Sequence, residues 1–202
     1  MPQPSALARV VVLAGPSGVG KSRLAAATGL PVLRLDDFYR SGDDPELPRI
    51  THGANTGIVD WDDPRSWHAD EAVRAICDLA ETGRTVAPIY DIARNGPSGT
   101  HEVDLHGASL FVAEGIFAQE IVRACTTHGV LAAALCLRQR PLVTFWRRLT
   151  RDLREHRKPP LVLVRRGWAL MRDQRRVIAD AAALGCTVVS PHEAAERIRG
   201  LR

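Results

Sequence analysis

A glycine-rich octapeptide constrains this sequence more than any other feature. Residues 15–22 read Gly-Pro-Ser-Gly-Val-Gly-Lys-Ser and fit the pattern G-x-x-x-x-G-K-[ST]. The apolar residues 9–14 before it predict a buried strand, and residues 21–28 predict a helix. A glycine-rich turn between a strand and a helix N-terminus lets backbone N–H groups approach phosphate oxygens closely. The octapeptide therefore predicts a phosphate-binding loop.

The two polar residues that close this loop predict a nucleotide and a metal. Lys21 would neutralise the β- and γ-phosphates of ATP, and the Ser22 hydroxyl would be a ligand of Mg²⁺. The residues expected to bind the nucleotide are Gly15, Ser17, Gly18, Val19, Gly20, Lys21 and Ser22.

The rest of the 202-residue chain alternates short apolar runs with helical patterns. This alternation predicts one α/β domain over residues 1–202, with a parallel sheet and helices on both faces. Strands are expected at 9–14, 32–35, 85–90, 109–113, 130–137 and 186–189, and helices at 21–28, from Asp63-Pro64 to Gly83, and at 117–126. Two polar segments, about 36–63 and 91–107, are expected to be functional loops at the carboxyl ends of the strands.

Composition excludes several classes of protein. Apolar residues make up 45% and charged residues 25%, which is typical of a globular domain and not of a disordered or collagen-like chain. The longest apolar run, 130–137, has eight residues and is too short to span a membrane. No signal peptide is evident and no C-x-x-C pair occurs, so we expect a cytoplasmic protein without membrane contact, in which a homo-oligomer is possible.

Positive charge concentrates late in the chain. Between Arg138 and Arg176 lie 13 basic and 3 acidic residues. Residues 141–160 within this segment predict an amphipathic helix that ends at Pro159-Pro160 and carries arginines on one face. Such a segment suits a polyanion, either a nucleic acid or the phosphates of a nucleotide. Phe145 and Trp146 fall on the apolar face, which leaves no aromatic stacking platform and disfavours nucleic acid.

Two adjacent acids follow the second predicted strand. Phosphoryl transfer to a hydroxyl needs a carboxylate that accepts the proton. Asp36 and Asp37 cannot both point the same way from an extended backbone, so one can face the phosphate while the other caps the loop. The residues alone do not decide which acid is the base.

Five segments in the same order resemble those of the uridine–cytidine kinases, the uridine kinase-like branch of the P-loop nucleoside kinases. They extend over residues 10–158 together with the glycine-rich loop. The segments are Asp36-Asp37-Phe38-Tyr39-Arg40 (similar to D-S-F-Y-R), Asp60-Trp61-Asp62-Asp63-Pro64 (N-F-D-H-P), Pro88-Ile89-Tyr90-Asp91 (P-x-Y-D), Glu114-Gly115-Ile116 (E-G-I) and Arg147-Arg148-Leu149-Thr150-Arg151-Asp152 (R-R-x-x-R-D). The resemblance implies a P-loop kinase fold with a small, arginine-rich helical lid over about 141–160.

The resemblance also implies catalytic roles. Asp36 would be the base that deprotonates the sugar 5′-hydroxyl. Glu114, at the end of its strand, would join Ser22 at Mg²⁺. Arg148 and Arg151, one helical turn apart in the lid, would close over the phosphates.

Further residues would form the acceptor site by the same resemblance. Tyr39 and Tyr90 would line the nucleoside pocket, with Trp61 beside the acceptor and Asp62 on the ribose hydroxyls. Asn95 stands where the family carries a histidine that reads the pyrimidine. An asparagine can still donate and accept hydrogen bonds.

The sequence therefore predicts an ATP-dependent kinase that transfers the γ-phosphoryl group in line to a hydroxyl of a small molecule, with a uridine- or cytidine-like nucleoside as the first candidate. Because Ile92 replaces a family aromatic and Arg94 lies next to Asn95, a pantothenate-like or sugar-phosphate-like acceptor stays an alternative. A non-catalytic nucleotide-binding protein is disfavoured because Lys21 and Glu114 accompany the acids.

Overall fold

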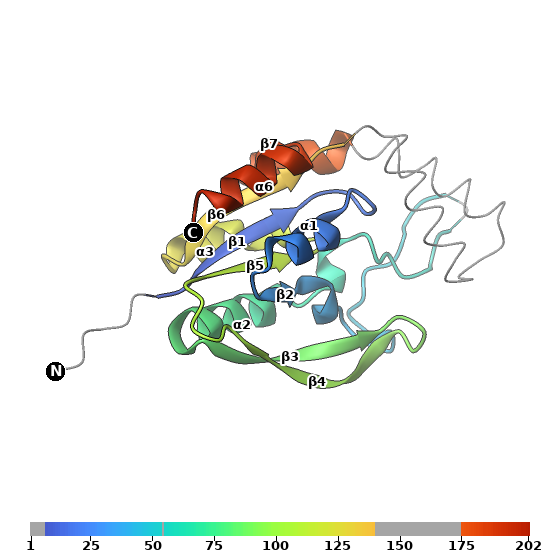
Figure 1. The fold of residues 1–202 in the computed structure, drawn as a ribbon. Coiled ribbons are helices and arrows are strands. Elements are labelled where there is room, and N and C mark those ends of the chain that lie inside the picture. Colours follow the sequence, from blue (N-terminus) through green and yellow to red (C-terminus); the bar gives the residue numbers. More distant parts are fainter. Residues whose placement is uncertain (1–6, 54, 140–174) are drawn as a thin grey trace.

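The computed structural model describes residues 7–53, 55–139 and 175–202. A five-stranded parallel sheet with the order β2-β5-β1-β6-β7 lies at its centre (Figure 1). Its strands are β1 (Arg9–Ala14), β2 (Val32–Arg34), β5 (Leu110–Glu114), β6 (Leu131–Leu137) and β7 (Thr187–Val189). The predicted parallel sheet is confirmed. The strand expected at 32–35 is one residue shorter because the chain turns at Leu35.

Helices cover both faces of the sheet, as the sequence pattern predicts. Successive side chains of a strand point to opposite faces. Val10 and Val12 of β1 therefore pack toward one face, with α2 (Ala69–Thr82), α3 (Val122–Thr127) and the 3₁₀ helix η3 (Ala118–Ile121). Val11 and Leu13 pack toward the other face, with α1 (Lys21–Thr28) and α6 (Pro191–Arg199). The two layers hold the carboxyl ends of the strands in fixed register.

The segment 84–104 differs from the prediction. β3 (Arg84–Asp91) and β4 (Gly96–Asp104) form a separate antiparallel hairpin instead of a strand of the parallel sheet followed by a loop. The residues from Pro97 to Glu102 are all exposed, so β4 lacks the apolar alternation by which a half-buried strand is found. The expected loop at 91–107 is therefore wrong as a loop, and only a short turn remains at its start.

The start of α2 also differs from the prediction. The side chain of Asp63 accepts a 2.9 Å hydrogen bond from the backbone N–H of Arg65, but this caps a short 3₁₀ helix, η2 (Pro64–Ser66), and not the α-helix. α2 begins at Ala69 and ends at Thr82, and Gly83, with its left-handed φ of 78°, caps it. A third 3₁₀ helix, η1 (Leu35–Phe38), follows β2 and carries the two adjacent acids.

In residues 7–53, 55–139 and 175–202, no helix is long and apolar enough to cross a membrane. The predicted lid at about 141–160 lies outside the described residues.

Candidate active site

The glycine-rich loop lies between β1 and α1, at the carboxyl end of the sheet (Figure 1). Gly15, Gly18 and Gly20 have φ angles of 133°, 82° and 104°, which favour glycine. A side-chain Cβ on Gly15 would lie 2.8 Å from the carbonyl oxygen of Leu137 on the neighbouring β6. The loop thus adopts a conformation that its glycines alone permit, and Ser17 and the buried Val19 complete it between them.

The two polar residues at the end of the loop have different surroundings. Lys21 is buried, with 8% of its surface exposed, and its Nζ donates a 2.8 Å hydrogen bond to the carbonyl oxygen of Gly15. Ser22 is exposed, and its hydroxyl lies close enough to Glu114 to influence the pKa of that carboxyl group. The lysine amine therefore lies beneath the phosphate-binding loop, and the serine hydroxyl faces the end of β5.

Glu114 closes β5, which lies between β1 and β2 in the sheet. Only 5% of this residue is exposed. Burial raises the pKa of its carboxyl group, while the nearby Ser22 hydroxyl and the charge of Lys21 oppose the rise. Because burial disfavours the ionised form of this carboxyl group, a further positive charge such as a metal ion would stabilise it.

Ser22 and Glu114 also fit the chemistry of Mg²⁺, which prefers oxygen ligands and retains several waters. The two side chains are near each other, since Ser22 influences the pKa of Glu114. Within the described residues, no group of three or more His, Cys, Asp or Glu side chains is placed to hold a metal ion. The protein would therefore supply these two oxygen donors, and phosphate oxygens and waters would supply the rest.

Asp36 and Asp37 leave η1 in different directions. Asp36 is exposed, and its Oδ1 accepts a 2.8 Å hydrogen bond from the backbone N–H of Ile116. Asp37 is 5% exposed, and its Oδ1 accepts a 3.3 Å hydrogen bond from the backbone N–H of Tyr90. Asp36 is thus the acid that solvent and a substrate can reach, whereas Asp37 is enclosed by protein.

Gly115 allows the close approach that holds Asp36. A Cβ at this position would lie 2.8 Å from the Cβ of Leu35 and 2.9 Å from Oδ1 of Asp36. A glycine is therefore required where the turn after β5 meets η1. The sequence motif contained this glycine, but its physical role becomes visible only in the packed structure.

An aromatic cluster lies next to Asp36. The ring of Tyr39 is 5.9 Å from that of Trp61, 5.7 Å from that of Tyr90 and 5.8 Å from that of Phe117, between centroids. The Tyr39 hydroxyl donates a 3.3 Å hydrogen bond to the carbonyl oxygen of Trp61. The pKa of Tyr39 is raised, mainly by burial and further by the negative charges of Asp36 and Asp62.

The structure therefore brings together most of the residues that the sequence assigned to the acceptor. Tyr39, Trp61, Asp62 and Tyr90 meet although they come from three separate segments. Phe117, which sequence reasoning placed only in a helix, belongs to the same cluster. Its position three residues after Glu114, at the carboxyl end of a strand, is the signal that could have found it.

Asn95 lies in the turn of the β3–β4 hairpin. Its φ of 49° is left-handed, a conformation that asparagine tolerates better than most residues. Its backbone carbonyl oxygen accepts a 2.6 Å hydrogen bond from the N–H of Gly42. The predicted role of its side chain on the acceptor stays a prediction. Neighbouring Arg94 is exposed, with its Nε 3.5 Å from a carboxylate oxygen of Asp91.

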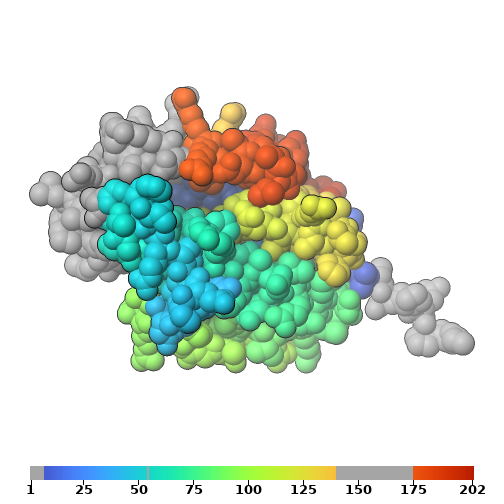
Figure 2. All heavy atoms as spheres, turned by 180° about the vertical axis from the view of Figure 1, so that it is seen from behind, coloured from blue at the N-terminus to red at the C-terminus, as the bar shows by residue number. Residues whose placement is uncertain are grey.

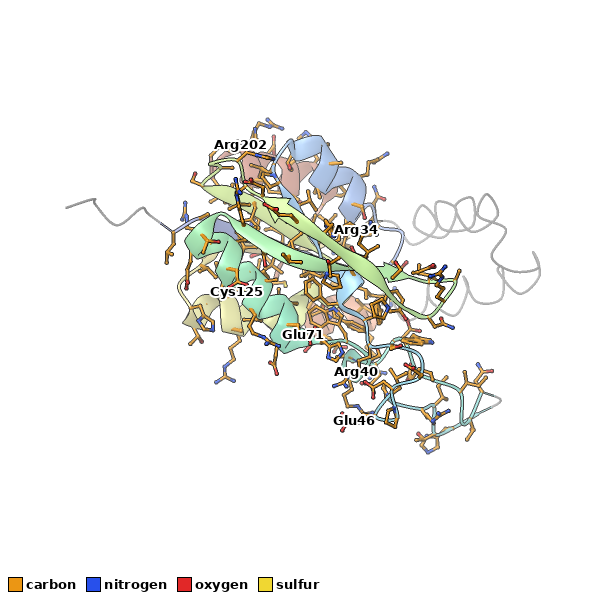
Figure 3. The ribbon with its side chains drawn as sticks, turned by 90° about the horizontal axis from the view of Figure 1, so that it is seen from below. Arg34, Arg40, Glu46, Glu71, Cys125 and Arg202 are labelled. Atoms are coloured by element: carbon orange, nitrogen blue, oxygen red, sulfur yellow. The ribbon has the colours of Figure 1, made fainter. Side chains whose placement is uncertain are left out.

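Arg148 and Arg151 lie outside the described residues. Within the described residues, Arg40 forms its ion pairs with the loop that follows η1 and not with Asp36 or Asp37. Its Nη1 lies 2.9 Å from Asp44 and 3.5 Å from Glu46 (Figure 3). This arginine therefore stabilises the loop that follows η1.

A hollow is visible from behind the molecule, with deep blue atoms of the N-terminal part at its floor and the loops near residues 45–65 along one side (Figure 2). A separate groove of about 440 Å³ lies beside the phosphate-binding loop, between α1 and the start of α6. It is lined by Val19, Gly20, Arg23, Leu24, Ala27, Pro191 and His192.

A comparison with known proteins found a similar sequence. A uridine kinase of Saccharomyces cerevisiae (strain ATCC 204508 / S288c) is 30% identical over 116 residues, which cover 54% of this chain. The match spans only 22% of the length of the yeast protein. No family model matches the sequence.

The fold has solved counterparts. The crystal structure of a protein named as a candidate fructose transport system kinase, from Silicibacter sp. TM1040, superimposes with a TM-score of 0.62 at 22% identity. The superposition covers 88% of this chain and 87% of the other. With its parallel sheet, flanking helices and glycine-rich loop, the chain has the α/β P-loop kinase fold, and it is similar to the uridine kinase-like P-loop kinases.

Proposed function

We propose that this protein is an ATP-dependent kinase that transfers the γ-phosphoryl group in line to a hydroxyl of a nucleoside resembling uridine or cytidine. One observation carries the proposal. Asp36 is exposed, is held by the N–H of Ile116, and lies within electrostatic reach of both Glu114 and Tyr39. A carboxylate at the border between a phosphate site and an aromatic pocket is placed to accept a hydroxyl proton.

The nucleotide half of the proposal rests on the loop and its surroundings. Backbone N–H groups of the glycine-rich loop would bind the phosphates, and Lys21 would neutralise them. Ser22 and Glu114 would hold Mg²⁺, which supplies positive charge to the β- and γ-phosphates when bound. The groove at Pro191 and His192 is adjacent to the loop and would receive the base of the nucleotide.

Charge in the acceptor pocket favours an uncharged acceptor. The negative charges of Asp36 and Asp62 both act on Tyr39. An anionic acceptor would be repelled by these two carboxylates. This supports a hydroxylated neutral molecule over the pantothenate-like and sugar-phosphate-like alternatives. Arg94, the cation suggested for an acidic acceptor, is instead beside Asp91.

An uncharged sugar without a base is the second candidate. Asn95 and Ile92 are not aromatic, so neither residue offers an aromatic surface for a base. The backbone carbonyl oxygen of Asn95 is bonded to the N–H of Gly42, and Ile92 is 60% exposed. The solved structure with the similar fold is named for a fructose transport system kinase. The hydroxyl-binding carboxylates suit both acceptors.

We assign the closing of the site over its substrates to residues about 141–160. Arg148 and Arg151 in this segment would stabilise the charge that spreads over the transferred phosphoryl group. A lid that excludes water would also limit hydrolysis of ATP without an acceptor.

The test is ADP release from Mg-ATP by the purified protein, measured with a panel of nucleosides, neutral sugars, sugar phosphates and pantothenate against a blank without acceptor. We expect stimulation by uridine or cytidine above the blank. Stimulation by a neutral sugar alone would replace the nucleoside and keep the kinase. Binding of ATP without stimulation by any acceptor would contradict the proposed transfer.

A further inference from the structure

The buried carboxylate of Asp37 has no part in the chemistry proposed above. Its Oδ1 accepts the 3.3 Å hydrogen bond from the N–H of Tyr90, and its Oδ2 lies 3.6 Å from Nε of Arg34. Arg34 is well exposed, whereas the side chain of Asp37 is 7% exposed. Both carboxylate oxygens are therefore engaged, one with a backbone group of the acceptor pocket and one with a surface cation.

Tyr90, the hydrogen-bond partner of Asp37, lies in a hairpin that is not part of the main sheet. The β3–β4 hairpin forms its own two-stranded sheet. Its base is tied to α2, where Thr85 donates a 3.4 Å hydrogen bond to Asp78. Its far half, which carries Tyr90, must be positioned by contacts with the segment that follows β2.

Two hydrogen bonds of the described residues make this connection. One is that between Tyr90 N–H and Asp37, and the other is the 2.6 Å bond between Gly42 N–H and the carbonyl oxygen of Asn95. The first lies directly beside the acid of the site, because Asp36 precedes Asp37 in η1. One end of the Asp36–Asp37 pair thus faces the reacting groups while the other end fixes the wall of the pocket.

We propose that Asp37 is a positioning residue that sets the distance between Asp36 and the acceptor wall formed by Tyr90. This inference rests on the proposed kinase function and goes beyond it, since it gives the second acid a purpose. Without the Asp37 carboxylate, the backbone N–H of Tyr90 loses its hydrogen-bond acceptor. The hairpin then moves relative to η1, and the acceptor is no longer presented to Asp36 in a reactive geometry.

Two substitutions separate this role from a general structural one. Asp37→Ala removes the acceptor of the hydrogen bond, and Asp37→Asn keeps an oxygen at the same position while it removes the charge. The ion pair with Arg34 contributes little because its N–O distance of 3.6 Å is long and the arginine is well exposed. Asp37→Ala should therefore lower kcat/KM for the acceptor about 10- to 100-fold, and Asp37→Asn should stay within about threefold of the original protein. The KM for ATP should be unchanged in both.

Asp104→Ala is the matched control. Asp104 lies at the other end of the hairpin, accepts a 2.6 Å hydrogen bond from the N–H of His106, and has its Oδ2 3.0 Å from Nε of Arg84. It therefore makes the same two kinds of contact as Asp37, but far along the hairpin from Tyr90. Its loss should leave kcat/KM for the acceptor at the level of the original protein.

Hydrogen exchange of the Tyr90 amide tests the anchor without turnover. The amide should exchange at least about tenfold faster in Asp37→Ala than in Asp37→Asn or in the original protein. An unchanged exchange rate, or equal losses of kcat/KM in Asp37→Ala and Asp104→Ala, would overturn the inference. An original protein that no acceptor stimulates would overturn the proposed function instead, and the exchange measurement would still decide whether Asp37 anchors Tyr90.

Discussion

The carboxylate of Asp36 accepts a 2.8 Å hydrogen bond from the backbone N–H of Ile116, which lies 80 residues away in the sequence. This bond fixes η1 against the turn after β5. It places Asp36 next to Glu114, whose pKa its charge helps to raise. The bond uses Oδ1, so in the proposed reaction Oδ2 would be the oxygen that accepts a proton from the acceptor hydroxyl.

Asp36→Asn should abolish most of the turnover and leave nucleotide binding near normal. The amide keeps an oxygen for the N–H of Ile116 but cannot act as a base. A general base typically contributes 10²- to 10⁴-fold, so a loss of about this size is expected in kcat. Steady-state kinetics and ATP titration measure the two effects. A variant that retains more than about a tenth of the rate would contradict the assignment of Asp36 as the base.

Lys21→Ala, in contrast, should weaken both turnover and nucleotide binding.

Gly115→Ala should reduce turnover by displacing Asp36. The added methyl group would lie 2.8 Å from Cβ of Leu35 and 2.9 Å from Oδ1 of Asp36, so η1 must shift. Overpacking of this kind typically costs about 1–3 kcal/mol of stability, which urea denaturation detects. Gly200→Ala is the control, because its nearest neighbour would be 3.6 Å away. Equal activity and stability in the two variants would show that the approach at Gly115 is not tight.

The buried Glu114 predicts a specific pH dependence of stability. Because the pKa of its carboxyl group is raised above 4.5 in the folded protein, the folded state retains a proton that the unfolded state releases. Its contribution is therefore fully present below about pH 4.5 and declines as the pH rises through the folded-state pKa. Each unit by which the pKa is raised corresponds to about 1.4 kcal/mol.

Glu114→Gln removes this titration and provides the comparison. The free energy of unfolding, measured by urea denaturation between about pH 4 and pH 8 without Mg²⁺, should fall with pH more steeply in the original protein than in the variant. Parallel curves would contradict the raised pKa. We also expect Glu114→Gln to lose activity that depends on Mg²⁺, because an amide oxygen carries no charge for the metal ion.

Gly42→Ala should alter acceptor binding through the hairpin turn. A Cβ on Gly42 would lie 2.9 Å from Cβ of Asn95 and 3.0 Å from its carbonyl oxygen. The turn must move away, and the KM for the acceptor should rise several-fold while the KM for ATP is unchanged. Ser41→Ala adds no bulk and serves as the control. If the KM for the acceptor rises by the same factor in both variants, the Gly42–Asn95 contact does not shape the pocket.

Much of the framework follows from short segments of sequence. The phosphate-binding loop combines an apolar strand, glycines at left-handed positions and a helix start, so its structure is encoded within about 20 residues. The capping box at Ser190, which accepts a 3.3 Å hydrogen bond from the N–H of Glu193, is local as well. The hairpin strand β4 escaped prediction because its side chains are exposed and carry no apolar period.

The site itself was decided by packing. The sequence placed Asp36 and Asp37 after a strand and expected them to diverge from an extended backbone, but they lie in the 3₁₀ helix η1. It also did not determine which one remains open to a substrate. In the parallel sheet, Glu114 of β5 is paired with Leu13 of β1 and with Arg34 of β2. β5 therefore lies between the strand that precedes the glycine-rich loop and the strand that precedes η1. Hydrogen bonds to Ile116 and Tyr90 then distinguish the two acids. Such pairings join residues that are far apart in the chain, and only the tertiary structure selects them, because periodicity and turn propensity act over a few residues.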